Sequence, residues 1–411
     1  MSAKKVKLGD VACYIRGITF KPADVVPAHS PDSVVCMTTK NVQATLDESK
    51  LTAVHRRFVK RDEQYLQCGD ILISSANSWN LVGKATYVPK LLYAATAGGF
   101  IAILRAQEEK VDSRYLYHWI AAGETQHRAR LCARQTTNIA NLDRERFLGL
   151  KIPLPPLPEQ RRIAAILDKA DAVRRKRQHT LDLADQFLRS AFLDLFGDPS
   201  LHAATIGELL EDGILLLHKD GNHGSQYPRA EEFGDAGIPF LTARSITDSG
   251  TIDDAHVQRL VEEKARQLKI GWLEEGDVLL AHNATVGRTA LYRGEYREAL
   301  IGTSLTAFRP DPNSLLPQYL LGALASERFQ RQLASVMSQT TRNQVPITAQ
   351  RRLSLPIPAV KEQREYALLT ERTANHLTRL NSGLTTLREL QNSLTQRAFQ
   401  GRLPQPPGGE S

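Results

Sequence analysis

Cysteine is scarce in this sequence, and its placement excludes two ways of stabilising a fold. The 411 residues hold four cysteines, none of them beyond position 132 and none in a Cys-x-x-Cys pair. They are Cys13, Cys36, Cys68 and Cys132. A disulfide framework or a structural zinc site requires paired or clustered cysteines. We therefore expect neither of them, and no metal.

Long apolar runs are also missing. The longest apolar stretch, residues 91–104, contains two glycines and is shorter than the roughly 18 residues that a membrane-spanning helix needs. The first ten residues lack the apolar run of a signal peptide. We expect a cytoplasmic protein that has no membrane partner.

Two enzyme signatures are absent as well. A methyltransferase that holds a flipped base needs an Asn-Pro-Pro-aromatic or similar loop, and the sequence has none. A nucleotide-driven motor needs Gly-x-x-x-x-Gly-Lys-Ser/Thr, but Gly83-Lys84 is followed by Ala85 and no glycine stands five residues before Gly83. The sequence predicts a protein that is not an enzyme and needs no cofactor.

The sequence does carry an excess of positive charge. Its 53 Lys and Arg residues outnumber the 45 Asp and Glu residues, which gives a net charge of +8. Such a field attracts polyanions, so nucleic acid is the leading candidate partner.

A repeat at an offset of about 204 residues organises the chain. The segment 37–42 aligns with 241–246, 100–105 with 304–309, and Gln135-Thr136-Thr137 with Gln339-Thr340-Thr341. Each half consists of a mixed α+β segment of about 155 residues, a proline-rich joint and a long stretch without proline. Because proline fixes φ and restricts the residue before it, the joints separate a globular domain from a helix.

The two proline-free stretches predict long helices. Apolar residues recur every three or four positions from Ile163 to Leu195, with an interruption at Arg177, and again from Leu377 to Ala398, with one polar position at Gln391. Each helix would be about 60 Å long and would expose an apolar seam unless it packed on a partner. We expect the two helices to pack on each other antiparallel, which inverts one domain relative to the other. Duplex DNA has the same two-fold symmetry, so two different domains would read an asymmetric, split site.

Taken together, these features resemble those of a known protein family. The repeated plan, the joint 153–160 that continues as 161–168, and its weaker counterpart at 356–364 are similar to the DNA-specificity subunit of type I restriction-modification systems. The second joint has fewer prolines than the first. The resemblance covers nearly the whole chain and implies an α+β fold in which two tandem target-recognition domains are separated by two long helices packed as an antiparallel coiled coil.

The resemblance also implies a function and partners. Each target-recognition domain would read one half of a bipartite site in double-stranded DNA, and the helices would dock methyltransferase (M) and restriction/translocase (R) subunits. These partners would supply all catalysis of the DNA methylation complex. The expected segments are target-recognition domain 1 (1–157), spacer helix 1 (158–198), target-recognition domain 2 (199–360), spacer helix 2 (361–403) and a flexible tail (404–411).

Base reading requires polar side chains with paired donors and acceptors, and polar loops in register in both halves supply them. One loop contains Asn77 in the first half and Asn283 in the second, each followed by a basic residue. The other is the Gln-Thr-Thr loop. The alternative for both is a turn whose Ser, Thr and Asn side chains bond their own backbone. The candidate DNA-binding residues are Thr19, Lys21, Asn77, Ser78, Asn80, Lys84, Gln135, Thr136, Thr137, Asn138, Asn222, His223, His282, Asn283, Thr285, Arg288, Gln339, Thr340, Thr341, Arg342 and Asn343.

Partner docking needs an apolar surface outside the helix–helix seam. Six apolar residues lie partly off that seam. These candidates are Phe187, Phe192, Leu193, Phe196, Leu390 and Phe399.

Two other functions remain open. Asp32 with Glu48 and Lys50 has the residue types of a metal-dependent DNA nuclease, although the second half lacks the pattern. A scaffold or interaction protein that does not bind DNA is the other alternative, and it predicts weak DNA binding without a steep salt dependence.

Overall fold

The computed structural model describes residues 4–136, 139–198, 200–224, 227–247, 250–337 and 343–403, and for part of the last helix its backbone only. The chain divides into two units. Unit 1 comprises residues 1–177 and 382–411, and unit 2 comprises residues 178–381. None of the helices in the described ranges is long and apolar enough to span a membrane.

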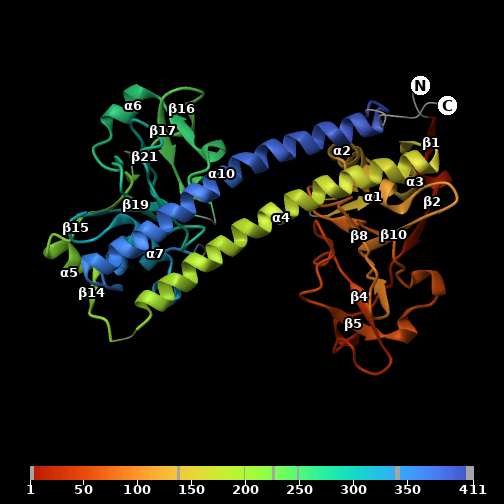
Figure 1. The fold of residues 1–411 in the computed structure, drawn as a ribbon, viewed down its shortest axis with the longest axis horizontal. Helices are drawn as coiled ribbons and strands as arrows, with labels where there is room; N and C mark the ends of the chain where they lie inside the picture. The colour runs from red at the N-terminus through yellow and green to blue at the C-terminus, as the bar shows by residue number, and fades with distance from the viewer. Residues whose placement is uncertain are drawn as a thin grey trace. The chain divides into compact units, whose positions relative to one another are not determined.

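Unit 1 combines short strands with three short helices and one part of each of the two long helices (Figure 1). Its strands are β1 (Lys5–Lys7), β2 (Ala12–Arg16), β3 (Val25–Val26), β4 (Ser33–Met37), β5 (Thr52–His55), β6 (Ile71–Ser74), β7 (Ala76–Asn77), β8 (Ala85–Tyr87), β9 (Ala95–Ala97), β10 (Ile101–Ala106), β11 (Ala133–Gln135), β12 (Ala140–Leu142) and β13 (Lys151–Pro153). Its helices are α1 (Ser113–Ala121), α2 (Gly123–Leu131), α3 (Arg144–Leu148), the start of α4 (Leu157–Phe196) and the end of α10 (Val360–Phe399).

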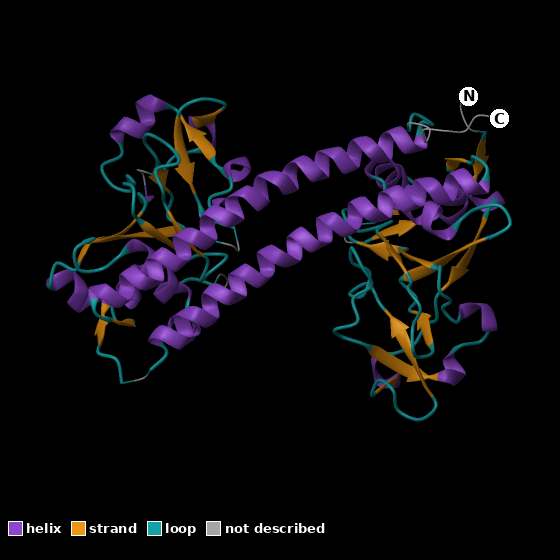
Figure 2. Cartoon of the chain, viewed as in Figure 1, coloured by secondary structure: helices purple, strands orange, loops and turns teal. Residues whose placement is uncertain are grey.

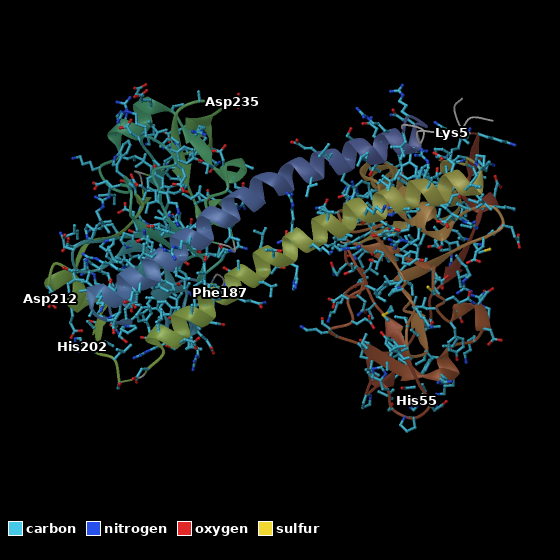
Figure 3. The ribbon with its side chains drawn as sticks, viewed as in Figure 1. Lys5, His55, Phe187, His202, Asp212 and Asp235 are labelled. Atoms are coloured by element: carbon cyan, nitrogen blue, oxygen red, sulfur yellow. The ribbon has the colours of Figure 1, made fainter. Side chains whose placement is uncertain are left out.

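The larger sheets of unit 1 lie at its two ends. The sheet β2-β10-β6-β8 and the pair β1-β13 lie near the helices, whereas the sheet β3-β5-β4-β9 lies at the end away from α4 (Figure 2). His55, the last residue of β5, marks that far end (Figure 3). A further sheet, β11-β12-β7, connects the segment after β6 with the segment after α2.

Unit 2 repeats this plan. Its strands are β14 (Ala203–Thr205), β15 (Leu215–Asp220), β16 (Phe233–Gly234), β17 (Ile238–Leu241), β18 (Gln258–Leu260), β19 (Val278–Ala281), β20 (Thr289–Leu291), β21 (Leu300–Ile301), β22 (Leu305–Pro310) and β23 (Ser354–Pro356). Its helices are the end of α4, α5 (Ile206–Glu211), α6 (Glu262–Gln267), α7 (Pro317–Ala325), α8 (Glu327–Ser335), α9 (Ile347–Gln350) and the start of α10. The sheet orders β15-β22-β19-β20, β16-β18-β17-β21 and β14-β23 match those of unit 1.

A buried ion pair confirms that the repeat extends to side chains. Arg105 binds Asp70 through Nε and Nη2 at 2.7 and 2.8 Å, and Arg309 binds Asp277 with the same two distances. Both aspartates are fully buried at the start of a buried strand, β6 or β19. A buried charge needs such a partner, because its desolvation would otherwise be costly.

The joints after β13 and β23 are fixed by two buried glutamines. Gln160 accepts a hydrogen bond from the Asp112 backbone and donates to the carbonyl oxygens of Lys110 and Pro155. In unit 2, Gln363 makes the equivalent three bonds to Leu316, Ser314 and Pro358. These bonds hold the first turn of each long helix against its own domain.

The two long helices are antiparallel. Unit 1 holds the N-terminal part of α4 and the C-terminal part of α10, and unit 2 holds the opposite parts. In unit 1, Gln391 Nε2 donates to Asp171 Oδ1, and Ala398 shares a core with Ile163 and Leu167. In unit 2, Phe192 packs edge-on against Tyr366 with ring centroids 5.3 Å apart. The predicted fold class, two α+β domains with an antiparallel helix pair, is confirmed.

Candidate nucleic-acid interface

Two polar loops occupy matching places in the two units. We call residues 75–84 the first Asn loop and residues 281–288 the second Asn loop. The Ser74 N–H donates to Lys84 O at 2.9 Å and the Gly83 N–H donates to Ser74 O at 2.8 Å, which closes the base of the first loop. Ala281 and Arg288, then Gly287 and Ala281, form the same two bonds at 2.8 Å each in the second. Each loop is therefore a closed hairpin between paired strands.

In unit 1 the structure brings the two predicted reading segments together. Ala140 of β12 lies opposite Asn77 of β7 on one side and opposite Gln135 of β11 on the other. Adjacent strands are about 4.8 Å apart, so the backbones of Asn77 and Gln135 lie roughly 10 Å apart. Segments almost 60 residues apart in the sequence thus form one polar surface.

Unit 2 repeats the pairing of the Asn loop within its described residues. Asn283 forms an isolated antiparallel bridge with Gln344, and the Ala284 N–H donates to Asn343 O at 3.2 Å. The Val345 N–H donates to His282 O at 2.9 Å. The second Asn loop therefore pairs with the segment that follows the second Gln-Thr-Thr loop. Thr137, Asn138, Gln339, Thr340, Thr341 and Arg342 lie outside the described residues, so their candidacy stays a prediction.

The exposed members of the first Asn loop differ from those that hold its shape. Ser78 and Asn80 are exposed, as is Gln135. Asn77 instead donates from Nδ2 to Ser74 Oγ at 3.0 Å and accepts from the Ser78 N–H at 2.8 Å, which is the turn role that the sequence left open.

Two neighbours of these segments have local partners. Lys84 Nζ donates to Gln43 Oε1 at 2.6 Å in an exposed contact. Thr136 is exposed, and its Oγ1 donates to Ile139 O at 2.8 Å. The hydroxyl hydrogen of Thr136 is therefore engaged within the loop.

Two predicted DNA contacts in unit 2 are corrected by burial. His282 is 1% exposed, and its Nδ1 lies 2.8 Å from Thr306 Oγ1. Asn222 is 8% exposed and donates from Nδ2 to Ile270 O at 2.6 Å. Both side chains bond to groups inside the domain, because a buried polar group needs a hydrogen-bond partner there.

Other predicted contacts in unit 2 are at the surface. Thr285 and Asn343 are exposed, and Asn283 is half-buried. His223 is exposed and forms a 2.6 Å contact with Asp220. Arg288 is half-buried, and its Nη1 donates to Ile246 O at 3.3 Å.

The stretch after β2 carries the exposed residues Thr19 and Lys21. A Cβ on Gly17 would lie 2.2 Å from Gly98 O, and one on Gly221 would lie 2.4 Å from Ile301 O. Glycine is required at both positions because the backbones approach so closely. This agreement supports the alignment of the two stretches across the repeat.

The predicted partner-docking residues separate into exposed and buried groups. Phe187 of α4, Leu193 of α4 and Leu390 of α10 are 51%, 64% and 52% exposed. Figure 3 labels Phe187 on its helix. These three residues are accessible to a partner.

The other three are already packed. Phe192 and Phe196 are buried against Tyr319, so they belong to the core of unit 2. Phe399 lies half-buried with its ring centroid 5.3 Å from that of Tyr115. We therefore correct the docking assignment of Phe192 and Phe196, because their aromatic surfaces are covered by their own domain.

A buried polar network lies next to the second Asn loop. The sequence shows its individual histidines but does not predict that they belong to one network. His218 Nε2 lies 3.1 Å from Gln350 Oε1, and Gln350 Nε2 donates to Thr306 Oγ1 at 3.1 Å. Thr306 continues the chain to His282. Burial lowers the pKa of His218 to about 4 and also lowers the pKa of His282. Both histidines are therefore neutral, and both belong to the hydrogen-bonded network next to the loop.

In unit 1 a charged cluster joins α1 to α4. Arg114 and His118 of α1 both contact Asp168 of α4, Arg114 through Nε at 3.1 Å and His118 through Nε2 at 2.8 Å. Burial lowers the pKa of His118, and the hydrogen bonds from Arg114 and His118 lower the pKa of Asp168 against the opposing effect of its own burial. The cluster fixes the start of α4 on its domain.

A metal-dependent nuclease needs several metal-binding side chains close together. Across the described residues, no three His, Cys, Asp or Glu side chains are placed together to hold a metal ion. Glu48, one of its three residues, accepts a hydrogen bond from Tyr93.

Comparison with known proteins agrees with this geometry. Residues 2–181 match the type I restriction modification DNA specificity domain. The StySPI specificity subunit of Salmonella potsdam is 24% identical, over 96% of this chain and 87% of that protein. The EcoKI specificity subunit of Escherichia coli K12 is 25% identical over the same shares.

A solved structure shares the fold. The crystal structure of the type I restriction-modification S subunit from M. genitalium matches with a TM-score of 0.55 and 16% identity, over 97% of this chain and 96% of that one. The domain match over residues 2–181 and the near full-length relatives lead to one conclusion: the chain is similar to type I restriction-modification specificity subunits, and it shares their fold.

Proposed function

We propose that this chain is the DNA-recognition and assembly subunit of a type I restriction-modification complex. It reads a bipartite, asymmetric site in double-stranded DNA, one half with each target-recognition domain. It has no catalytic role of its own and works in the cytoplasm. The proposed domains are residues 1–157 and 199–360, and the helical spacers are 158–198 and 361–403; the expected tail, residues 404–411, lies outside the described residues.

The observation that carries this proposal is the pairing of an Asn loop with a second polar segment in both units. Asn77 lies opposite Ala140, and Asn283 lies opposite Gln344. The two surfaces share a backbone plan and differ in side chains, which is what two readers of different half-sites require. Exposed Ser78, Asn80 and Thr285 are the side chains best placed to reach base edges.

The partner surface is proposed on the long helices. Phe187, Leu193 and Leu390 are large apolar side chains that remain exposed. Exposed apolar side chains of this size favour contact with another protein. We assign these exposed positions, two in unit 2 and one in unit 1, to contacts with methyltransferase subunits, with restriction subunits joining through them.

A selection experiment tests the function. The chain, assembled with its methyltransferase subunits, is incubated with a random duplex library, and the bound DNA is sequenced. The proposal predicts two enriched half-sites of different sequence at a fixed separation. Enrichment of a single continuous motif, or none at all, would contradict it. A DNA-independent scaffold would also show no steep loss of binding with salt.

The nuclease alternative has a separate test. Purified chain with magnesium and plasmid is predicted to leave the DNA intact. Cleavage that Asp32→Ala abolishes would establish a nuclease instead.

A further inference from the structure

One glutamine of unit 1 connects the base of the first Asn loop with a helix end. Gln126 of α2 donates from Nε2 to Gly83 O at 2.9 Å and to Ile120 O at 2.8 Å. Gly83 closes the loop, and Ile120 lies in the last turn of α1, where carbonyl groups lack helical partners. A single side-chain amide thus fastens the loop to the helical layer of its domain.

Unit 2 contains the same connection. Gln330 of α8 donates from Nε2 to Gly287 O at 2.9 Å and to Leu324 O at 2.7 Å. The sequence separations, 43 and 6 residues, are identical in the two units. The Asn loops differ in length and in most of their side chains, yet their anchor is the same. The two units therefore share the same support beneath loops whose side chains differ.

The backbone at the anchored position is specialised for this contact. Gly83 has a φ of 81° and Gly287 a φ of 98°, in the left-handed region that favours glycine. A Cβ on Gly287 would lie 2.3 Å from Oε1 of Gln330, and one on Gly83 would lie 3.1 Å from Cβ of Ala129. The helix carrying each glutamine is therefore packed directly on the base of its loop.

We infer that Gln126 and Gln330 are positioning residues for DNA reading: each holds one Asn loop in the orientation in which its exposed side chains meet one half-site. This inference rests on the proposed function. The glutamines are half-buried and each Nε2 serves two protein carbonyl groups, so they act through the loops rather than on DNA. Base reading depends on hydrogen bonds of defined geometry, so a loosened loop loses discrimination.

The test measures discrimination at each half-site separately. The full chain, assembled with its methyltransferase subunits, is titrated with the selected duplex and with duplexes in which one half-site is scrambled. Gln126→Met is expected to lower the Kd ratio for one half-site by at least about tenfold, the scale of one good base contact, and to leave the other ratio unchanged. Gln330→Met is expected to do the reverse.

A matched variant separates positioning from general stability. Gln332 lies on the same helix as Gln330, and it accepts at 3.0 Å from the Ser354 N–H and donates at 3.0 Å to Ser354 O, away from the loop. Gln332→Met is expected to leave both Kd ratios unchanged. A variant that only reduces the folded fraction also leaves these ratios unchanged, because the ratio does not depend on the active concentration.

The possible results of this experiment test the role of the two glutamines separately from the proposed function. If the Met variants do not fold, Gln126→Glu and Gln330→Glu keep the size and remove the donors. Hydrogen exchange of the loop amides is expected to accelerate only in the unit that carries the substitution. Unchanged ratios, or equal loss at both half-sites, would overturn the inference. Failure of the unsubstituted chain to discriminate at all would overturn the proposed function itself.

Discussion

The side-chain oxygen Oε1 of Gln160 accepts a hydrogen bond from the backbone N–H of Asp112 at 2.9 Å. Asp112 caps α1 by accepting from the Tyr115 N–H, so the bond joins the start of α4 to the start of a domain helix. Gln160 is 1% exposed and satisfies two carbonyl groups as well. The orientation of each long helix on its domain is therefore set by a buried polar side chain.

Replacing this glutamine should destabilise unit 1. Gln160→Leu leaves one N–H and two carbonyl groups buried without partners, and we expect the free energy of unfolding to fall by about 3 kcal/mol. Urea unfolding measures the change. Gln178→Leu on the exposed face of the same helix is the control, with an expected change within about 0.5 kcal/mol. Equal effects of the two substitutions would show that Gln160 has no anchoring role.

The buried His218 should make unit 2 sensitive to acid. Its pKa falls from 6.5 to about 4 on folding, so the unfolded chain binds the proton more readily between these values. Its contribution to stability is therefore complete above about pH 6.5 and is lost as the pH falls toward 4, to a total of about 3 kcal/mol.

Denaturant unfolding at several pH values measures this loss. His218→Gln is expected to flatten the dependence between pH 6.5 and 4, whereas His223→Gln, at an exposed position, is expected to keep it. A His218→Gln chain with the same acid dependence as the unsubstituted protein would refute the assignment.

Two phenylalanines five residues apart on α4 should respond differently to substitution. Phe187→Ser is expected to weaken assembly with methyltransferase subunits and leave the free energy of unfolding within about 0.5 kcal/mol, because the side chain is exposed. Phe192→Ala is expected to lower the free energy of unfolding by roughly 3–5 kcal/mol, because it empties an aromatic core. Sedimentation and thermal unfolding distinguish the two effects. Normal assembly of the Phe187→Ser chain would remove this residue from the docking surface.

The lengths of the long helices should set the gap between half-sites. Each has 40 residues, or about 60 Å at 1.5 Å per residue. Inserting one heptad in both helices is expected to lengthen the preferred gap by about three base pairs of 3.4 Å each. Selection from a random duplex library reports the gap. A gap that does not change would mean that the helices are not the spacer.

The repeat and the periodicity carry enough information to predict the fold and the position of the Asn loops. Gln135 and Asn77 are recognisable as polar residues in register, and the strand pairing through Ala140 brings them together. Local sequence does not reveal that His282 is buried, because its partner Thr306 is 24 residues away, on β22.

The same limit explains the two docking residues that the sequence assigned wrongly. Phe187 and Phe192 are equivalent by residue type and lie on one helix. Phe192 is buried against Tyr319 and Tyr366 in the space left by Gly322, since a Cβ on Gly322 would lie 2.7 Å from the Phe192 ring.

The most direct test of the account exchanges one domain. Residues 1–150 are replaced by the same segment of another specificity subunit whose recognition site is known, and the methylated sequence of the assembled complex is determined. The account predicts that one half-site takes the sequence read by the donor and that the other half-site is unchanged. A change in both half-sites, or in neither, would contradict the claim that each domain reads its own half.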